Sequence, residues 1–269
     1  SMVVACKVNH DRMISRYRCT APCGHKNEET VLATQQQSDV LVIGGGLAGL
    51  VTAYECLQAG KRVTLVERDT RERLGGLALW AFGGMALVGT PLQARMKIPD
   101  TPEVALRDWI RFGELGEADV LPRQWAHYYV QHSRAQVYDW LLGKGIQFMP
   151  AVNWVERGMQ GNGNTVPRYH IVWGTSRRLA TRMIELMLEA GGAGRLTLLT
   201  GHRVTALESS AGQVSGAVAV NEANGAEVRL SAPVVVLAMG GINGSHEQTR
   251  ANWPANRPLP ATMLNGAHP

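Results

Sequence analysis

The residues with the clearest chemistry are three glycines and one acid. Gly44, Gly46 and Gly49 follow the apolar run Val40–Ile43 in the spacing G-x-G-x-x-G, and Glu67 closes a second apolar run. The first glycine allows a tight strand-to-helix turn, the second lets a pyrophosphate approach the backbone, and the third lets the helix pack closely. Unpaired N–H groups at the helix start attract the diphosphate. The spacing predicts a βαβ unit that binds a dinucleotide.

The acid narrows the choice of dinucleotide. Glu67 stands where a carboxylate accepts hydrogen bonds from the adenosine ribose hydroxyls, and its charge repels a 2′-phosphate. FAD or NAD is therefore expected rather than NADP, although the neighbouring Arg68 weakens that inference. The alternative is a plain glycine turn, which would not need an acid at this distance.

A second glycine-rich stretch follows this unit. Gly75 and Gly76 are separated by apolar residues from Gly83 and Gly84, with Trp80 and Phe82 between the pairs. Such a stretch is suited to a flat aromatic ligand lying against the backbone. The alternative is a buried turn packed by the two aromatic side chains.

These motifs together resemble a known family. The first glycine turn, Glu67–Arg68, the second glycine pair and the run 80–84 are similar to the amino-terminal part of FAD-dependent dehydrogenases of the fumarate reductase flavoprotein and 3-ketosteroid Δ1-dehydrogenase superfamily. The resemblance implies that the second pair lies by the flavin diphosphate and that the next segment follows the isoalloxazine. Many relatives carry Ser or Thr after that pair, where this chain has 77–79 Leu-Ala-Leu.

The resemblance also covers the later strands. It implies a β-meander in which the backbone of Val204 meets the adenine, and a returning strand that ends at Ala238 and Gly240. The predicted cofactor-binding residues are Gly44, Gly46, Leu47, Ala48, Gly49, Glu67, Arg68, Gly75, Gly76, Gly84, Val204, Ala238 and Gly240. The family's catalytic residues lie mainly in segments with no counterpart here, so we assign no catalytic residue.

The chain pattern predicts the elements that position these residues. Thr101–Pro102 marks a helix start, a longer helix should run from Pro122 to Gly143, and another should span 177–190. Strands are expected at 146–149, 196–200, 202–207, 213–220 and 226–230, the last four forming the meander. The predicted fold class is α/β: a Rossmann-like, glutathione-reductase-type FAD-binding domain with a β-meander and a helical insertion, expected to be incomplete.

Several titratable side chains have two interpretations. His127, Tyr128, Tyr129 and His132 fall on one predicted helix and are either acids for catalysis or, as we favour, packing and surface residues. His170 is either a substrate or flavin contact or, more commonly for a histidine beside aromatic residues, a core group with its hydrogen bonds satisfied.

Composition excludes several classes of protein. The net charge is +5 and no basic run alternates with aromatics, so a nucleic-acid partner is not expected. There is no run of 18 apolar residues, which predicts no membrane span and a cytoplasmic protein. Cys6, Cys19 and Cys23, with His10 and His25, do not match a common zinc-ligand spacing, so no metal is predicted. Cys56 is expected in the core.

The expected organisation is a flexible leader at 1–37 followed by an FAD-binding domain at 38–269. The implied reaction removes two hydrogens beside a carbonyl of a small, ketosteroid-like substrate, or adds them to an activated alkene, and a homo-oligomer is compatible with the sequence. Relatives continue into a catalytic portion, so we expect the chain alone to bind FAD weakly and not to turn over substrate. The alternatives are a non-catalytic dinucleotide-binding remnant and a short NAD- or FAD-binding biosynthetic enzyme.

Overall fold

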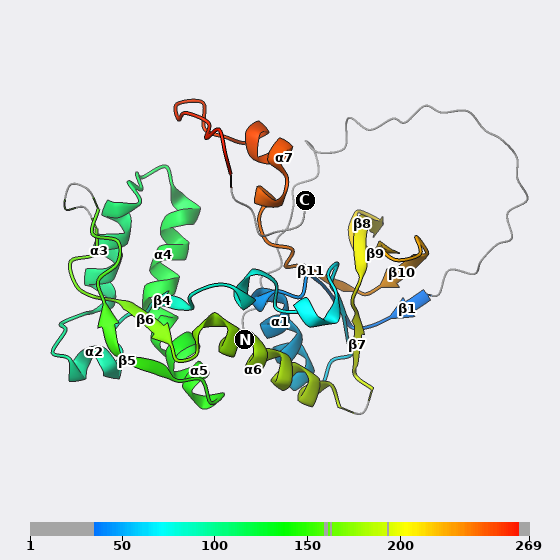
Figure 1. Ribbon diagram of the computed structural model, residues 1–269, viewed down its shortest axis with the longest axis horizontal. Coiled ribbons are helices and arrows are strands. Elements are labelled where there is room, and N and C mark those ends of the chain that lie inside the picture. The colour runs from blue at the N-terminus through cyan, green and yellow to red at the C-terminus, as the bar shows by residue number, and fades with distance from the viewer. Residues whose placement is uncertain (1–34, 159–160, 162, 193, 264–269) are drawn as a thin grey trace, which may run out of the picture.

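The computed structural model describes residues 35–158, 161, 163–192 and 194–263. These residues form a central parallel sheet, a meander sheet on one side of it and a mainly helical insertion on the other (Figure 1). The predicted α/β class, with its meander and helical insertion, is confirmed. The cysteines and histidines of the leader, for which no metal site is predicted, lie outside the described residues.

The central sheet has four parallel strands in the order β11-β2-β3-β7. Val42 of β2 pairs with Leu65 of β3 and with Val236 of β11, which sets the register. Every residue of β2 and β3 is buried, as expected for strands covered on both faces. The strand bounds are β2 Val40–Ile43, β3 Val63–Val66, β7 Leu196–Leu199 and β11 Val234–Leu237.

Side-chain alternation along β2 divides the core into two parts. Val40 and Val42 face the helices α1 (Leu47–Gln58) and α6 (Thr175–Gly191), which pack against each other. Leu41 and Ile43 point to the opposite face, where apolar residues of the meander cover them. The first glycine turn therefore follows a strand that is fixed from both sides.

The meander consists of β8 (His202–Ser210), β9 (Gln213–Asn221) and β10 (Glu227–Ser231), which pair in antiparallel order. Two details differ from the sequence prediction. Strand β7, predicted as part of the meander, pairs instead with β3 in the parallel sheet. Strand β1 (Gln35–Gln37) pairs with β10, so sheet structure begins within the last residues of the predicted leader.

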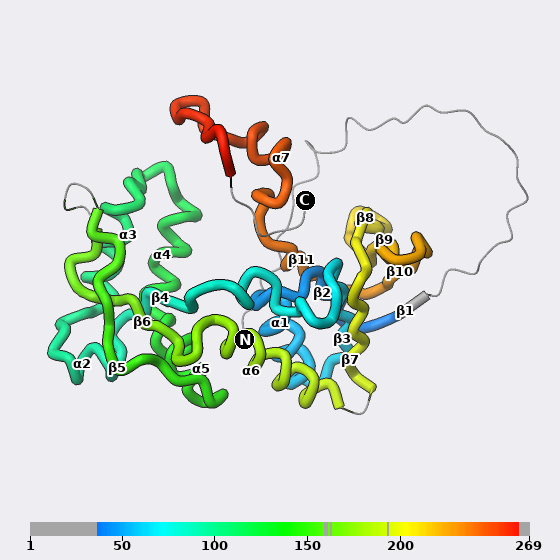
Figure 2. The backbone as a smooth tube through the Cα atoms, viewed as in Figure 1, coloured from blue at the N-terminus to red at the C-terminus, as the bar shows by residue number. Residues whose placement is uncertain are grey.

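In chain order the insertion lies between β3 and α6, and in space it is at the side of α1 and α6 that is opposite the meander (Figure 2). It contains a three-stranded sheet, in the order β4-β6-β5, and helices that pack on it. Its elements are η1 Arg71–Arg73, η2 Gly76–Leu79, β4 Gly84–Ala86, α2 Pro91–Arg95, α3 Pro102–Phe112, α4 Val120–His132, the π-helical turn Ser133–Asp139, α5 Trp140–Gly143, β5 Phe148–Asn153 and β6 Tyr169–Val172.

The helix signals in the insertion are largely accurate. The Thr101 hydroxyl accepts a hydrogen bond from the Val104 N–H (3.3 Å), which confirms the predicted cap of α3. The long helix begins two residues before Pro122 and ends at Gly143, with a π-helical turn that the pattern did not predict. The strand predicted at 146–149 is β5, which begins later and runs to Asn153.

A buried ionic cluster holds the insertion together. Arg168 pairs through Nη2 with Asp100 (2.8 Å) and through Nη1 with Asp108 (2.6 Å), and all three side chains are at most 3% exposed. Burial alone would raise the pKa of Asp108, but hydrogen bonds from Thr165 and Arg168 outweigh it and hold that pKa below its ordinary value. The cluster joins the segment before β6 to α3 and to the turn before α3.

The chain continues past β11 into the short helices η4 (Ile242–Gly244) and α7 (His246–Ala251). The Ser245 hydroxyl caps α7 by accepting a hydrogen bond from the Gln248 N–H (3.2 Å). Among the helices of the described residues, none has the length and apolar character needed to cross a bilayer.

Candidate dinucleotide site

The first glycine turn lies at the carboxyl ends of β2 and β11. Gly44 has φ +106°, in the region that favours glycine, and a Cβ there would overlap the Ala238 carbonyl oxygen. The Ala238 N–H donates to the Ile43 carbonyl at 2.8 Å. The structure thus brings together Gly44 and Ala238, which the sequence predicted for one site. Crevices at the carboxyl ends of parallel strands are where open α/β sheets bind ligands.

The other two glycines of the motif differ in what surrounds them. A Cβ on Gly49 would overlap the Gly44 carbonyl oxygen, so α1 packs directly on the turn. A Cβ on Gly46 would meet no atom within 4 Å. Packing therefore explains Gly49 and does not explain Gly46. The bare backbone at Gly46 faces open space, which is what close approach of a ligand requires.

The amino terminus of α1 offers hydrogen-bond donors toward that space. The first intrahelical bond runs from the Leu50 N–H to the Gly46 carbonyl at 2.9 Å. No described side chain caps the helix, and its first turn contains no acidic residue. The backbone N–H groups of Leu47, Ala48 and Gly49 therefore face the helix start, where an anion is favoured by the helix dipole.

Glu67 is in contact with the glycine turn. Its Oε2 accepts a hydrogen bond from the Gly45 N–H at 2.5 Å, and its Oε1 accepts one from the Asp69 N–H at 2.8 Å. The carboxylate therefore holds the turn in place. Its hydrogen bonding to the adenosine ribose stays a prediction. Each carboxylate oxygen has a second lone-pair site, so these bonds leave capacity for ribose hydroxyls.

Arg68 lies in an ionic group at the adenosine end of the predicted site. Its Nε is 3.6 Å from Glu222, and Arg203 contacts the same carboxylate at 2.6 Å. The guanidinium of Arg68 therefore lies beside a carboxylate of the β9–β10 turn. This arrangement reduces its ability to attract a 2′-phosphate, in agreement with the expectation from Glu67.

The second glycine pair lies beside the first. The Gly75 N–H donates to the Gly45 carbonyl at 2.9 Å, and Gly46 and Gly75 form an isolated parallel bridge. Gly75 and Gly76 both have positive φ, and a Cβ on Gly76 would meet only the Gly46 Cα, at 3.6 Å. The two turns thus form one surface of bare backbone. A side chain at Gly46 or Gly76 would occupy the space in front of this surface. This surface fits a diphosphate.

The segment after the second pair exposes its aromatic side chains. Trp80 is 68% exposed and Phe82 is 60% exposed, so the alternative of a turn packed by these two residues is wrong. Gly83 is required because a Cβ there would overlap the Ser176 nitrogen at the start of α6. A Cβ on Gly84 would overlap the Tyr169 ring, so packing accounts for this glycine without a cofactor.

The remaining predicted site residues lie in the meander and after β11. Val204, in β8, is half-buried and packs on the core beneath the meander. Gly240 has φ +83°, and a Cβ there would meet nothing within 4 Å, so it follows Ala238 into open space. Contact of either residue with a cofactor stays a prediction.

Most of the histidines and tyrosines considered for catalysis make structural contacts or are buried, whereas His127 is exposed on α4. His170 is completely buried; its Nε2 lies 2.7 Å from the Thr90 hydroxyl and its Nδ1 lies 2.7 Å from the Arg168 carbonyl. Burial lowers the pKa of His170, against the opposing effects of the Arg168 carbonyl and Asp100. Tyr128 stacks on His132, while burial raises the pKa of Tyr129. The packing interpretation is the one that the structure favours.

The candidate thiol Cys56 lies within the described residues, whereas the candidate metal ligands do not. Cys56 is half-buried on α1 and packs against the core, and burial raises the pKa of its thiol. Among the described residues no group of three or more metal-ligating side chains is present. Cys6, Cys19 and Cys23, with His10 and His25, lie outside those residues.

A family model for an FAD binding domain matches residues 39–266. This chain belongs to that FAD-binding family. The match confirms the predicted cofactor, FAD, and the oxidoreductase family that the sequence resembled. It begins at the start of the central sheet and includes both glycine turns.

Curated relatives include a steroid dehydrogenase and a fumarate reductase. A KsdD-like steroid dehydrogenase of Mycobacterium tuberculosis H37Rv is 38% identical over 251 residues, covering 85% of this chain and 43% of that protein. A cytochrome-type fumarate reductase of Shewanella frigidimarina is 26% identical over 230 residues, covering 85% of this chain and 38% of that protein. The chain therefore spans less than half the length of these relatives.

Solved structures share the fold of this FAD-binding domain. The 3-ketosteroid-Δ4-(5α)-dehydrogenase of Rhodococcus jostii RHA1 superposes with a TM-score of 0.67 at 24% identity, covering 82% of this chain and 50% of that one. An open flavocytochrome c3 fumarate reductase gives 0.65 at 25% identity, covering 80% and 36%. These likenesses confirm the predicted fold class.

One feature of the structure has no counterpart in the sequence predictions. A pocket is lined by Trp173, Arg177 and Arg178, among others, where β6 leads into α6. Two consecutive arginines after an exposed tryptophan were visible in the sequence. The pattern does not reveal that the turn preceding β5 lies opposite them and completes the pocket.

Proposed function

We propose that this chain is the FAD-binding part of an oxidoreductase that acts on a carbon–carbon bond next to a carbonyl, with a ketosteroid-like substrate. The observation that carries the proposal is the bare backbone surface of the two glycine turns in a chain 38% identical to KsdD-like steroid dehydrogenases. When bound, FAD supplies the group that takes up or gives the hydride. The proposed organisation is a leader at 1–37 and an FAD-binding domain at 38–269, in a cytoplasmic protein.

Each proposed contact has a physical role. The N–H groups of Leu47, Ala48 and Gly49 bind the diphosphate, and Gly46 and Gly76 let it lie against the backbone. Glu67 orients the adenosine ribose while it fixes the Gly45 peptide. The other proposed contacts are Gly44, Arg68, Gly75, Gly84, Val204, Ala238 and Gly240.

The proposed substrate class follows from the surface beside the second glycine pair. Leu77, Trp80 and Phe82 leave an apolar surface exposed along the segment proposed to follow the isoalloxazine. A flat apolar substrate gains from contact with such side chains, whereas a small dicarboxylate does not. The sequence identity to the steroid dehydrogenase, 38%, is higher than the identity to the fumarate reductase, 26%, and also supports a steroid-like substrate.

Two measurements test the proposal. Calorimetric titration of the apoprotein with FAD and NAD should show FAD binding at least about tenfold more tightly, with ADP competing, because both share the ADP half that the glycine turns hold. The visible spectrum of the FAD-loaded protein should shift when 4-androstene-3,17-dione binds, without the bleaching that turnover would cause, and it should not respond to fumarate. Tighter binding of NAD would contradict the cofactor assignment. A response to fumarate alone would contradict the substrate class.

A further inference from the structure

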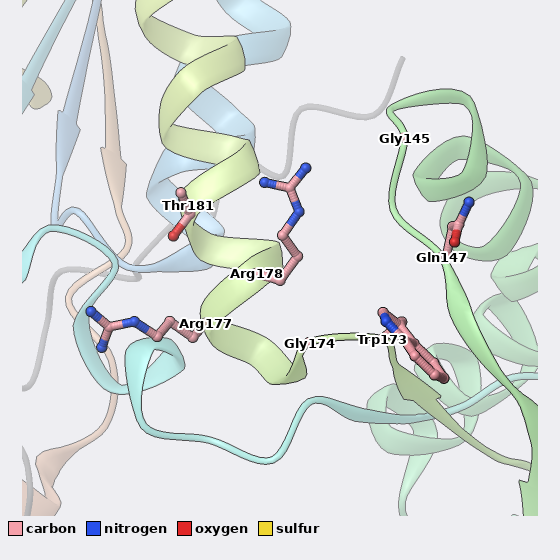
Figure 3. A pocket seen from close by; sticks show the side chains of 7 residues that line it. All are labelled: Gly145, Gln147, Trp173, Gly174, Arg177, Arg178 and Thr181. Carbon is pink, nitrogen blue, oxygen red and sulfur yellow. The ribbon is translucent and has the colours of Figure 1, made fainter.

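A pocket of about 540 Å³ opens between the start of α6 and the turn that precedes β5 (Figure 3). Its volume is within the range of small-molecule sites. Its lining residues include Arg177 and Arg178, and none of them is an Asp or Glu. The pocket lies outside the two glycine turns and is not used by the proposed dinucleotide site.

The two arginines are not equivalent. Arg178 extends from α6 into the gap that faces Gln147, whereas Arg177 leaves the helix toward the other side (Figure 3). The nearest carboxylate to Arg178 is Glu185, at 3.9 Å, and both side chains are more than 40% exposed. An exposed pair at this distance contributes little. The guanidinium that faces the gap is therefore available for an anion.

Trp173 forms an apolar wall of the pocket, and its backbone is held on both sides. Its N–H donates to the Gln147 carbonyl at 2.8 Å, and the preceding Val172 N–H donates to the Gly83 carbonyl at 3.0 Å. The indole is nevertheless 59% exposed. An exposed tryptophan on a fixed backbone provides a large apolar contact area, as in the centres of binding interfaces.

The turn between β6 and α6 brings these groups together. Gly174 has φ +85°, and a Cβ there would lie 3.0 Å from the Arg178 Cβ. Glycine therefore permits both the turn and the position of the arginine stem. The side chains of Gln147 and Thr181 also line the pocket, and each supplies hydrogen-bonding atoms at its rim.

We infer that this pocket binds a small organic carboxylate with a flat apolar body, its carboxylate on Arg178 and its ring on Trp173. A guanidinium recognises a carboxylate through two parallel hydrogen bonds, and the indole face accepts an aromatic or fused ring. One arginine facing the gap matches a single negative charge. The inference does not depend on the proposed function, because no residue of the glycine turns takes part.

The probe for this site is 2-naphthoate, titrated by calorimetry into the full chain with and without saturating FAD. We expect binding that is unchanged by FAD, with 2-naphthylmethanol and acetate each binding at least about tenfold more weakly. Arg178→Gln should lower the affinity for 2-naphthoate about tenfold. This is the loss expected for a charge-assisted pair that is weakened by the solvent exposure of Arg178. Trp173→Ala should weaken it by a similar factor.

Arg177→Gln is the matched control, because it removes the same charge from the same helical turn. We expect it to weaken 2-naphthoate by less than about threefold. Equal losses in the two arginine variants would mean that general surface charge attracts the probe. Displacement by FAD would place the probe in the dinucleotide site, and absence of measurable binding would overturn the inference directly. Arg178→Lys, with an expected intermediate affinity, covers the case in which Arg178→Gln does not fold.

Discussion

Replacing two glycines of the same motif by alanine should separate folding from cofactor binding. At Gly46 the backbone has φ −74°, and a Cβ meets nothing within 4 Å. Gly46→Ala should therefore change the free energy of unfolding by at most about 1 kcal/mol, the difference between these residues at a helix N-cap. The methyl group points into the space proposed for the diphosphate. We expect FAD affinity to fall at least about tenfold, or about 1.4 kcal/mol.

Gly49→Ala should have the opposite profile. Its methyl group would overlap the Gly44 carbonyl oxygen, so α1 must move away from the turn. Overpacking of this kind costs about 1 to 3 kcal/mol of folding stability. Urea unfolding and FAD calorimetry on both variants measure the two quantities. Gly143→Ala is the control, because its Cβ also meets no atom within 4 Å and α5 is outside the proposed site. Unchanged FAD affinity in Gly46→Ala would refute the proposed position of the diphosphate.

Three further predictions concern side chains. Glu67→Ala should lower FAD affinity by about 1.5 to 3 kcal/mol and cost some stability, because two backbone N–H groups lose their acceptor, while Glu67→Gln should cost less in both assays. Burial holds the pKa of His170 below its ordinary value, so as the pH falls the unfolded chain takes up a proton at a higher pH than the folded chain does. The free energy of unfolding should fall as pH decreases below about 6.5, by up to about 1.4 kcal/mol per pH unit, and His170→Gln should flatten that slope in urea unfolding. Arg168→Met leaves Asp100 and Asp108 buried without their cation, and should destabilise the protein by about 3 to 5 kcal/mol in the same assay; a loss below 1 kcal/mol would contradict the assigned role.

The βαβ unit was predictable because its signals are local. An apolar run, glycines at fixed spacing and an acid at a strand end each lie within a few residues of the structure they determine, and Gly44, Gly49 and Glu67 have the positions that the spacing implied. The helix cap at Thr101 was predictable for the same reason. What the spacing did not indicate is that Glu67 accepts a hydrogen bond from the turn itself.

The errors concern partners that are distant in the sequence. β7 has the composition of a meander strand, and only its pairing with β3 places it in the parallel sheet. The sequence also did not indicate that Gly84 packs against the Tyr169 ring, which is 85 positions away, and its contact with the cofactor stays a prediction. The π-helical turn has no distinct sequence signal, because the same residues fit an α-helix. Long-range packing decides the place of β7 and the surroundings of Gly84.

The segment that links the two parts of the molecule is fixed at both ends. Gly75 is bonded to Gly45 of the first turn, and Gly83 is bonded to Val172 of the insertion sheet. Trp80 and Phe82 are exposed between these two anchors. Because one anchor belongs to the central sheet and the other to the insertion, a shift of the insertion would move these aromatic side chains relative to the glycine turns. The buried Arg168 cluster stabilises the insertion and thereby the position of the second anchor, although none of its residues lines the proposed cofactor surface. A loss of FAD affinity in Arg168→Met would therefore be indirect, and it should be accompanied by a loss of stability, in contrast to the loss in Gly46→Ala.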